Sequence, residues 1–216
     1  MGVIVVATLV ACAGAKDDAV TSSGGTSGGT SGSSGSSGGG TDDDASSSGG
    51  LDAGSDAADA APAGFTLTSP AFAEGGKIPN ENACTGANVS PALRWSAGPT
   101  GTLSYALVFT DKSNGLVHAV MYDVPGATTS LPANVEKAYQ PANVPGAKQT
   151  AAYKPTARGY LGPCPGEEHT YELALYAIDV ATLPGTTMAT TRDQIVPMIM
   201  AHDLAVAKLT GTFVKP

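Results

Sequence analysis

Every aromatic residue of this 216-residue chain lies at or after Phe65. Residues 1–64 contain no Phe, Tyr or Trp and consist largely of Gly, Ser, Thr, Ala and Asp. Such a segment cannot bury enough apolar surface to offset the conformational entropy that is lost on folding. We therefore expect one folded domain over residues 65–216, a length that suffices for a sizeable hydrophobic core.

The formal net charge of −8 at pH 7 resides mainly outside the expected domain. Eight of the 19 acidic residues and one of the 11 basic residues precede Phe65, which leaves 11 acidic and 10 basic residues in the domain. The domain is thus nearly neutral, and the sequence shows no basic stripe with interleaved aromatic residues. These features argue against nucleic acid as a partner.

Residues 1–12 form a short apolar run that ends in Leu9-Val10-Ala11-Cys12. This ending resembles the lipobox at which bacterial lipoproteins are cleaved and acylated on the cysteine. The run is too short to span a membrane, and an accidental apolar N-terminus is the alternative. We expect an exported cell-envelope protein that touches the membrane only through lipid on Cys12, with residues 13–64 as a disordered tether. Ala13 favours the outer membrane if the cell is Gram-negative.

Two cysteines, Cys84 and Cys164, lie in the expected domain. If Cys12 is lipidated, they remain as an even pair in a compartment that permits disulfides. We predict that they form one disulfide, and two unpaired buried thiols are the alternative because sequence cannot show whether their Cα atoms lie within bonding range. Their spacing does not resemble a zinc site.

The domain is expected to be mainly β. Several segments of strand length alternate or run apolar, with Gly, Pro and Asn between them. These segments are residues 65–68, 92–96, 103–110, 116–123 and 170–179. Long irregular stretches such as residues 133–158 predict ordered loops around a sheet core.

One helix is expected near the C-terminus, where Thr191 and Gln194 are spaced to form a capping box. Pro197 would fall in its first turn or kink it, and Gly211 would end it, before a last strand over residues 212–214. Five residues at helical spacing define its expected apolar face. They are Ile195, Ile199, His202, Val206 and Leu209.

Three segments stand out by their order and spacing. The first is Asn88-Val89-Ser90-Pro91-Ala92-Leu93-Arg94-Trp95. The second runs from Leu107 to Asp111 and is followed by His118, and the third is Gly162-Pro163-Cys164-Pro165 with His169-Thr170-Tyr171. Together these segments resemble the signature of phosphatidylethanolamine-binding proteins, in the bacterial Raf kinase inhibitor-like branch. Weaker matches extend from Phe65 to Phe213, so the resemblance covers essentially the whole domain.

This resemblance implies a central antiparallel β-sheet packed on a second sheet, with few peripheral helices. It also implies a small pocket for phosphate-like or carboxylate groups. The implied pocket residues are Asp111, His118, His169 and Tyr171, with the Gly162-Pro163 loop beside them.

The chain departs from the family pattern at three points around this pocket. Ala119 replaces the usual aromatic residue after the first histidine, and Thr170 replaces the usual basic residue between the second histidine and the tyrosine. The loop at residues 112–115 is short and lacks a second Asp. We expect these changes to widen or reshape the mouth of the pocket.

The residues themselves suit anion binding. His169 and Tyr171 are two apart on an expected strand, so their side chains share one face. Asp111 ends another strand, where its carboxylate can fix an imidazole tautomer. Protonated histidines donate charge-assisted hydrogen bonds to an oxyanion. His202, on the expected apolar helix face, is interpreted as a core residue.

We therefore expect a binding module for a small anionic or phosphorylated ligand, with no cofactor and no evident catalytic machinery. One alternative is an inhibitor or regulator of a protein partner such as a protease or kinase, which the resemblance permits. A second alternative is a metal-dependent enzyme, because Asp111, His118 and His169 have the residue types of a two-histidine, one-carboxylate site.

Overall fold

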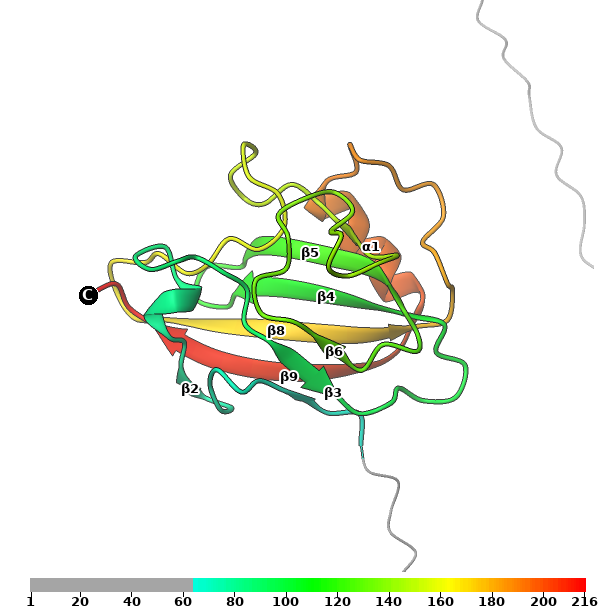
Figure 1. Cartoon of the computed structure of the whole chain (residues 1–216), viewed down its shortest axis with the longest axis horizontal. Coiled ribbons are helices and arrows are strands. Elements are labelled where there is room, and N and C mark those ends of the chain that lie inside the picture. Colours follow the sequence, from blue (N-terminus) through cyan, green and yellow to red (C-terminus); the bar gives the residue numbers. More distant parts are fainter. Residues whose placement is uncertain (1–63) are drawn as a thin grey trace, which may run out of the picture. The chain divides into compact units, whose positions relative to one another are not determined.

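The structure is a computed structural model that describes residues 64–216 (Figure 1). The expected signal segment, residues 1–12, lies outside the described residues, as does the expected tether up to residue 63. No helix among the described residues is long and apolar enough to cross a membrane.

A six-stranded sheet forms the centre of the domain, in the order β2-β9-β8-β4-β5-β7. Neighbouring strands are antiparallel except for the short parallel pair of β2 with β9. Figure 1 shows the long strands β5, β4, β8 and β9 side by side. The strands are β2 (Gly76–Lys77), β4 (Ser104–Asp111), β5 (Leu116–Pro125), β7 (Lys148–Gln149), β8 (His169–Ile178) and β9 (Asp203–Phe213).

A small antiparallel sheet lies over one face of the central sheet, in the order β1-β3-β6. It consists of β1 (Leu67–Thr68), β3 (Leu93–Trp95) and β6 (Ser130–Leu131). The main hydrophobic core lies between the two sheets, where the Trp95 ring meets the Tyr105 ring edge-on at 5.5 Å. The predicted mainly-β fold, with a central antiparallel sheet packed on a second sheet, is confirmed.

A second core lies on the opposite face of the central sheet, under α1 (Arg192–Ala201). Ile195 and Ile199 are fully buried there against strand residues such as Val108 and Val120. Thr191 caps the helix, because its hydroxyl accepts from the Gln194 N–H while the Gln194 side chain accepts from the Thr191 N–H. The predicted capping box is confirmed, and the described residues add one short 3₁₀ turn, η1 (Asn80–Asn82).

The predicted extent of the C-terminal helix is wrong. The helix ends at Ala201, and the residues expected to continue its apolar face, Val206 and Leu209, belong to β9. From Val206 onward buried residues alternate with more exposed ones, and residues 203–213 pair with β8 along its whole length. The helical spacing was therefore coincidental, because cross-strand pairing stabilises a period-two segment more than an isolated helical turn would.

Three residues in this region have roles different from those expected. Pro197, which was expected to fall in the first turn or to kink the helix, lies inside the helix in its second turn. His202 is the C-cap residue and not a core residue, since its Nδ1 pairs with the exposed Asp179 carboxylate at 2.8 Å. Gly211 lies within β9, where a Cβ atom would come within 2.8 Å of side-chain atoms of Phe72 and Ile78. Close packing thus explains this glycine.

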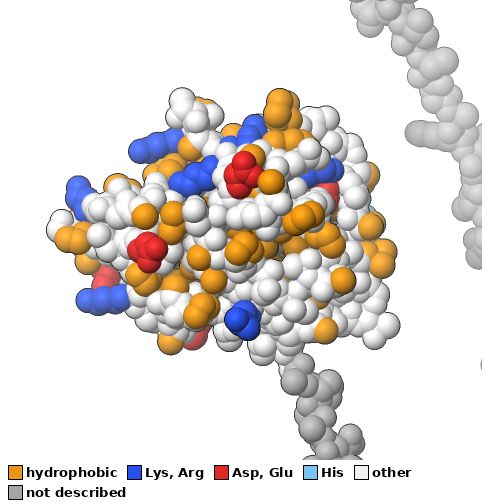
Figure 2. Space-filling model, in the orientation of Figure 1, with side chains coloured by type: hydrophobic (Ala, Val, Ile, Leu, Met, Phe, Trp, Pro, Cys, Tyr) orange, Lys and Arg blue, Asp and Glu red, His pale blue; other side chains and the backbone are white. Residues whose placement is uncertain are grey.

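The remaining strand predictions agree with the structure to within about two residues at each end. The stretch from 133 to 158 is irregular apart from β7 and a single bridge between Ala151 and Arg158. Figure 2 shows that the face of the domain in view is mixed, with hydrophobic, basic and acidic side chains interspersed. Loops connect the strands at both ends of the sheet, and the candidate site lies at one of these ends.

Candidate functional site

A cavity of about 190 Å³ opens where β4 ends, β5 begins and β8 begins. The loops at residues 112–115, 151–158 and 161–165 complete its wall. The lining residues are Asp111, Asn114, Leu116, His118, Tyr153, Cys164, Pro165, His169 and Tyr171. The structure thus brings together four of the predicted site residues, Asp111, His118, His169 and Tyr171, although 60 positions separate the first of them from the last.

Asp111 is the buried centre of this cluster, with 2 % of its surface exposed. Its Oδ2 atom accepts from His169 Nδ1 at 2.7 Å and from Asn114 Nδ2 at 3.1 Å. Its Oδ1 atom accepts from the Ser113 N–H at 2.9 Å. A buried carboxylate is tolerated when several donors satisfy its oxygens, and these three donors meet that condition.

His169 and Tyr171 lie on the same face of β8, as their spacing predicted. Their ring centroids are 6.3 Å apart, and Tyr171 is the direct cross-strand neighbour of Asp111. Burial, and next the charge of the Asp111 carboxylate, raises the pKa of the Tyr171 hydroxyl. The hydroxyl therefore stays protonated near neutral pH and can donate a hydrogen bond.

His118 reaches the cavity through a β-bulge. Phe109 pairs with Ala119 and Thr110 pairs with Val117, so His118 is the extra residue on β5. A bulge of this kind redirects a side chain, and here it places the imidazole against the rings of Phe109 and Tyr171, at 5.2 and 5.5 Å. Without the bulge, the regular alternation of a strand would place the adjacent residues His118 and Ala119 on opposite faces of the sheet.

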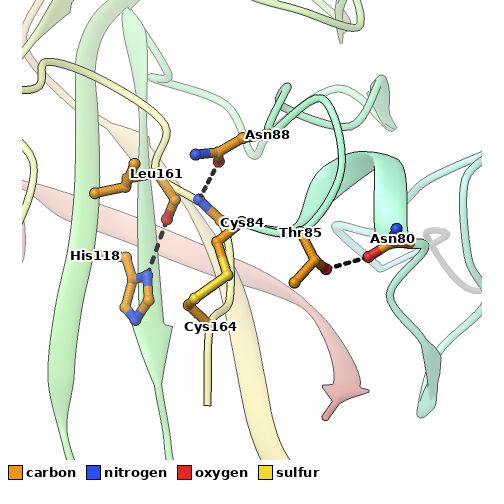
Figure 3. Close-up of a disulfide and its surroundings, with 8 residues drawn as sticks. Asn80, Cys84, Thr85, Asn88, His118, Leu161 and Cys164 are labelled. Carbon is orange, nitrogen blue, oxygen red and sulfur yellow. Dashed lines mark hydrogen bonds between the residues drawn. A yellow bond between two sulfur atoms is a disulfide. The ribbon is translucent and has the colours of Figure 1, made fainter. Parts of the chain in front are cut away.

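The His118 ring is held in one tautomer. Its Nδ1 atom lies 2.9 Å from the carbonyl oxygen of Leu161, which can only accept, so Nδ1 carries a proton (Figure 3). Burial is the largest influence on the His118 pKa and lowers it, while the Leu161 carbonyl and Asp111 act in the opposite direction. His118 is accordingly neutral near pH 7, with Nε2 as an acceptor.

The loop that carries Leu161 is clamped to the segment after η1 (Figure 3). Cys84 and Cys164 form a disulfide, as predicted, with their Cα atoms 5.3 Å apart. Beside it, the Cys84 N–H donates to the Pro163 carbonyl at 2.9 Å, and the Gly162 N–H donates to Asn88 Oδ1 at 2.8 Å. This clamp positions both the carbonyl that orients His118 and the Cys164 side of the cavity.

Gly162 and Pro163 do not line the cavity themselves. They act through the backbone contacts of the clamp. A Cβ atom on Gly162 would come within 2.2 Å of the Asn82 carbonyl oxygen, so only glycine allows the two segments to approach this closely. Both residues therefore support the wall of the cavity from behind.

Five of the nine lining residues were not predicted as pocket residues. Two of them, Cys164 and Pro165, directly follow the predicted Gly162-Pro163 loop, and the other three are Asn114, Leu116 and Tyr153. Asn114 belongs to the short turn between β4 and β5, and the Asp-x-x-Asn-Gly pattern of that turn could have indicated it, because Asn side chains bond to nearby groups in turns. Leu116 begins β5 on the other side of the same turn. Tyr153 lies in the irregular 133–158 stretch, and no sequence pattern marks it.

Two of the residues that depart from the family pattern, Ala119 and Thr170, lie outside the lining of the cavity. Ala119 is 7 % exposed and lines a separate internal cavity of about 30 Å³ between the sheets. Thr170 holds the turn after β4, since its N–H donates to Ser113 Oγ at 3.0 Å and its carbonyl accepts from the Lys112 N–H. Neither residue lines the cavity around Asp111.

The geometry gives no support to the two-histidine, one-carboxylate metal site. Asp111 lies behind His169 and binds its Nδ1 atom, so its oxygens are already engaged. Among residues 64–216 no group of three or more His, Cys, Asp or Glu side chains is placed to hold a metal ion. The arrangement is that of two oriented imidazoles and a phenol around an open space.

The fold has two packed sheets and a small polar cavity at one end of the central sheet, and this architecture can be compared with that of known proteins. The family model for phosphatidylethanolamine-binding proteins matches residues 68–214. The chain therefore belongs to the phosphatidylethanolamine-binding protein family, as its sequence motifs predicted.

Individual relatives agree with this membership. A UPF0098 protein of Chlamydia pneumoniae is 36 % identical over 159 residues, which cover 69 % of this chain and 98 % of the relative. A Mycobacterium tuberculosis protein named "Putative lipoprotein LppC" is 34 % identical over 169 residues, covering 73 % of this chain and 77 % of the relative. The crystal structure of Escherichia coli YbcL is described as that of a new member of the mammalian PEBP family. It superposes on this chain with a TM-score of 0.64 at 25 % sequence identity, and the match covers 71 % of this chain and 100 % of YbcL.

Proposed function

We propose that this protein is a lipid-anchored binding protein of the cell envelope that takes a small phosphate-like or carboxylate group into the cavity around Asp111. The observation that carries the proposal is the arrangement of the two imidazoles. His169 and His118 both line the cavity, and each has its Nδ1 atom bound to a protein oxygen. Nε2 is therefore the ring nitrogen that each histidine has left for a ligand.

The two histidines offer different chemistry to that ligand. When His169 is protonated, its Nε2 donates to an oxyanion while Asp111 balances its charge. The Tyr171 hydroxyl supplies a second donor. Neutral His118 instead accepts through Nε2, so it suits a hydroxyl on the ligand.

The cavity thus has hydrogen-bond donors on the side of His169 and Tyr171 and an acceptor at His118. We therefore expect a ligand that carries both a negatively charged oxygen and a hydroxyl proton. A singly protonated phosphate monoester meets this requirement, with its P–O⁻ toward His169 and Tyr171 and its P–OH toward His118. A carboxylate satisfies only the donors. We therefore expect phosphate monoesters to bind more tightly than carboxylates of similar size.

An NMR titration of the full chain with inorganic phosphate tests the proposal. The imidazole signals of His118 and His169 should shift saturably as phosphate is added. His202 is an internal control, because its Nδ1 also pairs with a carboxylate, at 2.8 Å, but it lies outside the cavity. Its signals should stay fixed.

Two outcomes would count against this function. Failure of His118 and His169 to respond would mean that the cavity takes no phosphate. Parallel movement of all three histidines would indicate general ionic strength effects. Acetate in a second titration ranks the two ligand classes, and tighter binding of acetate than of phosphate would contradict the role given to His118.

The lipid anchor is proposed from Cys12, which lies outside the described residues, and is supported by the relative that is named a lipoprotein. Metabolic labelling with a radioactive fatty acid in a bacterial host tests it. The wild-type chain should incorporate label, and Cys12→Ser should not. Equal labelling of both chains would contradict the anchor.

A further inference from the structure

A second and larger cavity, of about 500 Å³, lies beside the first. It is a cleft between the loop at residues 151–158 and the segment that leads into α1, and we call it the arginine cleft. Its walls combine apolar side chains with two guanidinium groups. The lining residues are Ala151, Ala152, Tyr153, Pro155, Arg158, Met188, Ala189, Thr190, Thr191, Arg192 and Asp193.

Arg158 is held rigidly at one side of the arginine cleft. Its two terminal nitrogens donate to the carbonyl oxygens of Gln149 and Met188, at 2.8 and 3.3 Å. Its guanidinium carbon lies 5.5 Å from the centre of the Tyr139 ring, a cation–π distance. These contacts use only part of its five N–H donors, so the ordered plane can still bind an anion.

Arg192 approaches from the first turn of α1. One terminal nitrogen donates to the Ala151 carbonyl at 3.1 Å. Its Nε atom is buried and has no hydrogen-bond partner in the structure. A buried donor without an acceptor is costly, so the Arg192 side chain is not satisfied by the protein alone.

The arginine cleft is electropositive. Within residues 64–216 neither Arg158 nor Arg192 forms an ion pair with a carboxylate, since the pairs present there involve Lys and His. Asp193, which is exposed, is the one acidic residue among the lining residues. The Nζ atom of Lys154 lies 5.8 Å from the Tyr153 ring and adds positive charge at the same edge.

Tyr153 lines both cavities and separates them. Its N–H donates to the His118 carbonyl at 3.0 Å, and its ring lies 4.6 Å from the His118 ring. Charge in the arginine cleft also acts on the first cavity, because Arg192 contributes to the lowered His118 pKa, after burial. The two cavities are thus adjacent sites on one surface.

We propose that the arginine cleft is a second anion-binding site, which takes a carboxylate or phosphate group carried on a small apolar body. The guanidinium groups of Arg158 and Arg192 bind the anionic group through charge-assisted hydrogen bonds. The side chains of Met188, Ala189 and Pro155 provide an apolar wall for the rest of the ligand. The site is distinct from the Asp111 cavity, and the proposal does not rest on ligand binding there.

Phenyl phosphate is a suitable probe, because it joins a phosphate to an apolar ring. Inorganic phosphate is first added only until the His118 and His169 signals stop shifting, and phenyl phosphate is then added in excess over it, so that its apolar ring favours it over inorganic phosphate in the arginine cleft. Backbone amide NMR signals of Ala151, Ala189 and Thr190 should shift saturably. In Arg192→Gln the affinity reported by these amides should fall about tenfold, the loss of one charge-assisted hydrogen bond.

Arg94→Gln is the matched control, because Arg94 is exposed on β3, outside both cavities. It should leave the titration unchanged. The proposal is overturned if the cleft amides of the wild-type chain do not respond, or if Arg192→Gln responds as strongly as the wild type. The signals of His118 and His169 in the initial phosphate step report separately on the proposed function, so failure of one site is distinguishable from failure of the other.

Discussion

The Nδ1 atom of His169 lies 2.7 Å from Oδ2 of Asp111, in a pair whose carboxylate is almost fully buried. A second pair, His202 with Asp179, has nearly the same distance of 2.8 Å but lies at the surface. The aspartate side chains are 3 % and 48 % exposed, respectively. The same contact can therefore be compared in a buried and a solvated setting within one chain.

Replacing Asp111 with Asn should destabilise the fold by about 1.5–3 kcal/mol, because charged hydrogen bonds are lost and the new NH₂ group faces a donor. Asp179→Asn should change the free energy of unfolding by less than about 0.5 kcal/mol, as is usual for surface substitutions. Urea unfolding measures both. Equal effects would show that burial of Asp111 contributes nothing to its role.

The stability of the domain should depend on the protonation of His118. Burial lowers the pKa of this group from 6.5, so below about pH 6.5 the unfolded chain takes up a proton that the folded chain does not. The free energy of unfolding should therefore fall as pH drops below 6.5, and level off once the folded form is also protonated. Above pH 6.5 the group contributes no pH dependence.

His118→Asn isolates this contribution, because Asn can still donate to the Leu161 carbonyl but does not titrate. Urea unfolding of both chains between about pH 8 and pH 5 gives the comparison. The wild type should lose more stability than the variant across this range. Parallel curves would mean that the His118 pKa is not lowered in the folded state.

Loss of the Cys84–Cys164 disulfide should destabilise the domain and weaken phosphate binding. The bond spans 80 positions, and a loop of that length corresponds to about 4.5 kcal/mol in the chain-entropy model. Binding should weaken because the clamp positions the Leu161 carbonyl and the Cys164 wall. Urea unfolding of the Cys84→Ser/Cys164→Ser variant measures the loss of stability, and the phosphate titration measures the change in affinity. Unchanged phosphate affinity in the folded variant would show that the backbone contacts of the clamp hold the cavity wall without the disulfide.

Ala119→Val should stabilise the domain by about 0.5–1 kcal/mol. The added methyl groups enter the internal cavity of about 30 Å³ that Ala119 lines. Ala174 is the control, because it is 3 % exposed on neighbouring β8 but does not line that cavity. Ala174→Val should destabilise by about 1–3 kcal/mol through overpacking. Thermal unfolding distinguishes the two, and a destabilised Ala119→Val chain would mean that the space cannot accept a methyl group.

The sequence predicted the local parts of this structure well. Segments that alternate or run apolar located β4, β5 and β8. The two-residue period of a strand placed His169 and Tyr171 on one face, because it depends on no distant contact. The capping box of Thr191 and Gln194 was likewise visible, since both of its hydrogen bonds lie within four residues. Motif order then indicated the family.

Local sequence patterns were misleading where distant segments decide the structure. Residues 203–209 fit a helical spacing as well as a strand, and only pairing with β8 selects the strand. Tyr153 lies in both cavities because of the path of an irregular loop, for which no periodic pattern exists.

By itself, the sequence determined that residues 65–216 fold, that the fold is mainly β, and which residue types could form an anion site. The tertiary structure alone decided how they meet. The bulge at His118 depends on the register between β4 and β5, and the orientation of its ring depends on a carbonyl 43 positions away at Leu161. Register and long-range hydrogen bonds are set by the packing of the whole sheet, so no local pattern encodes them.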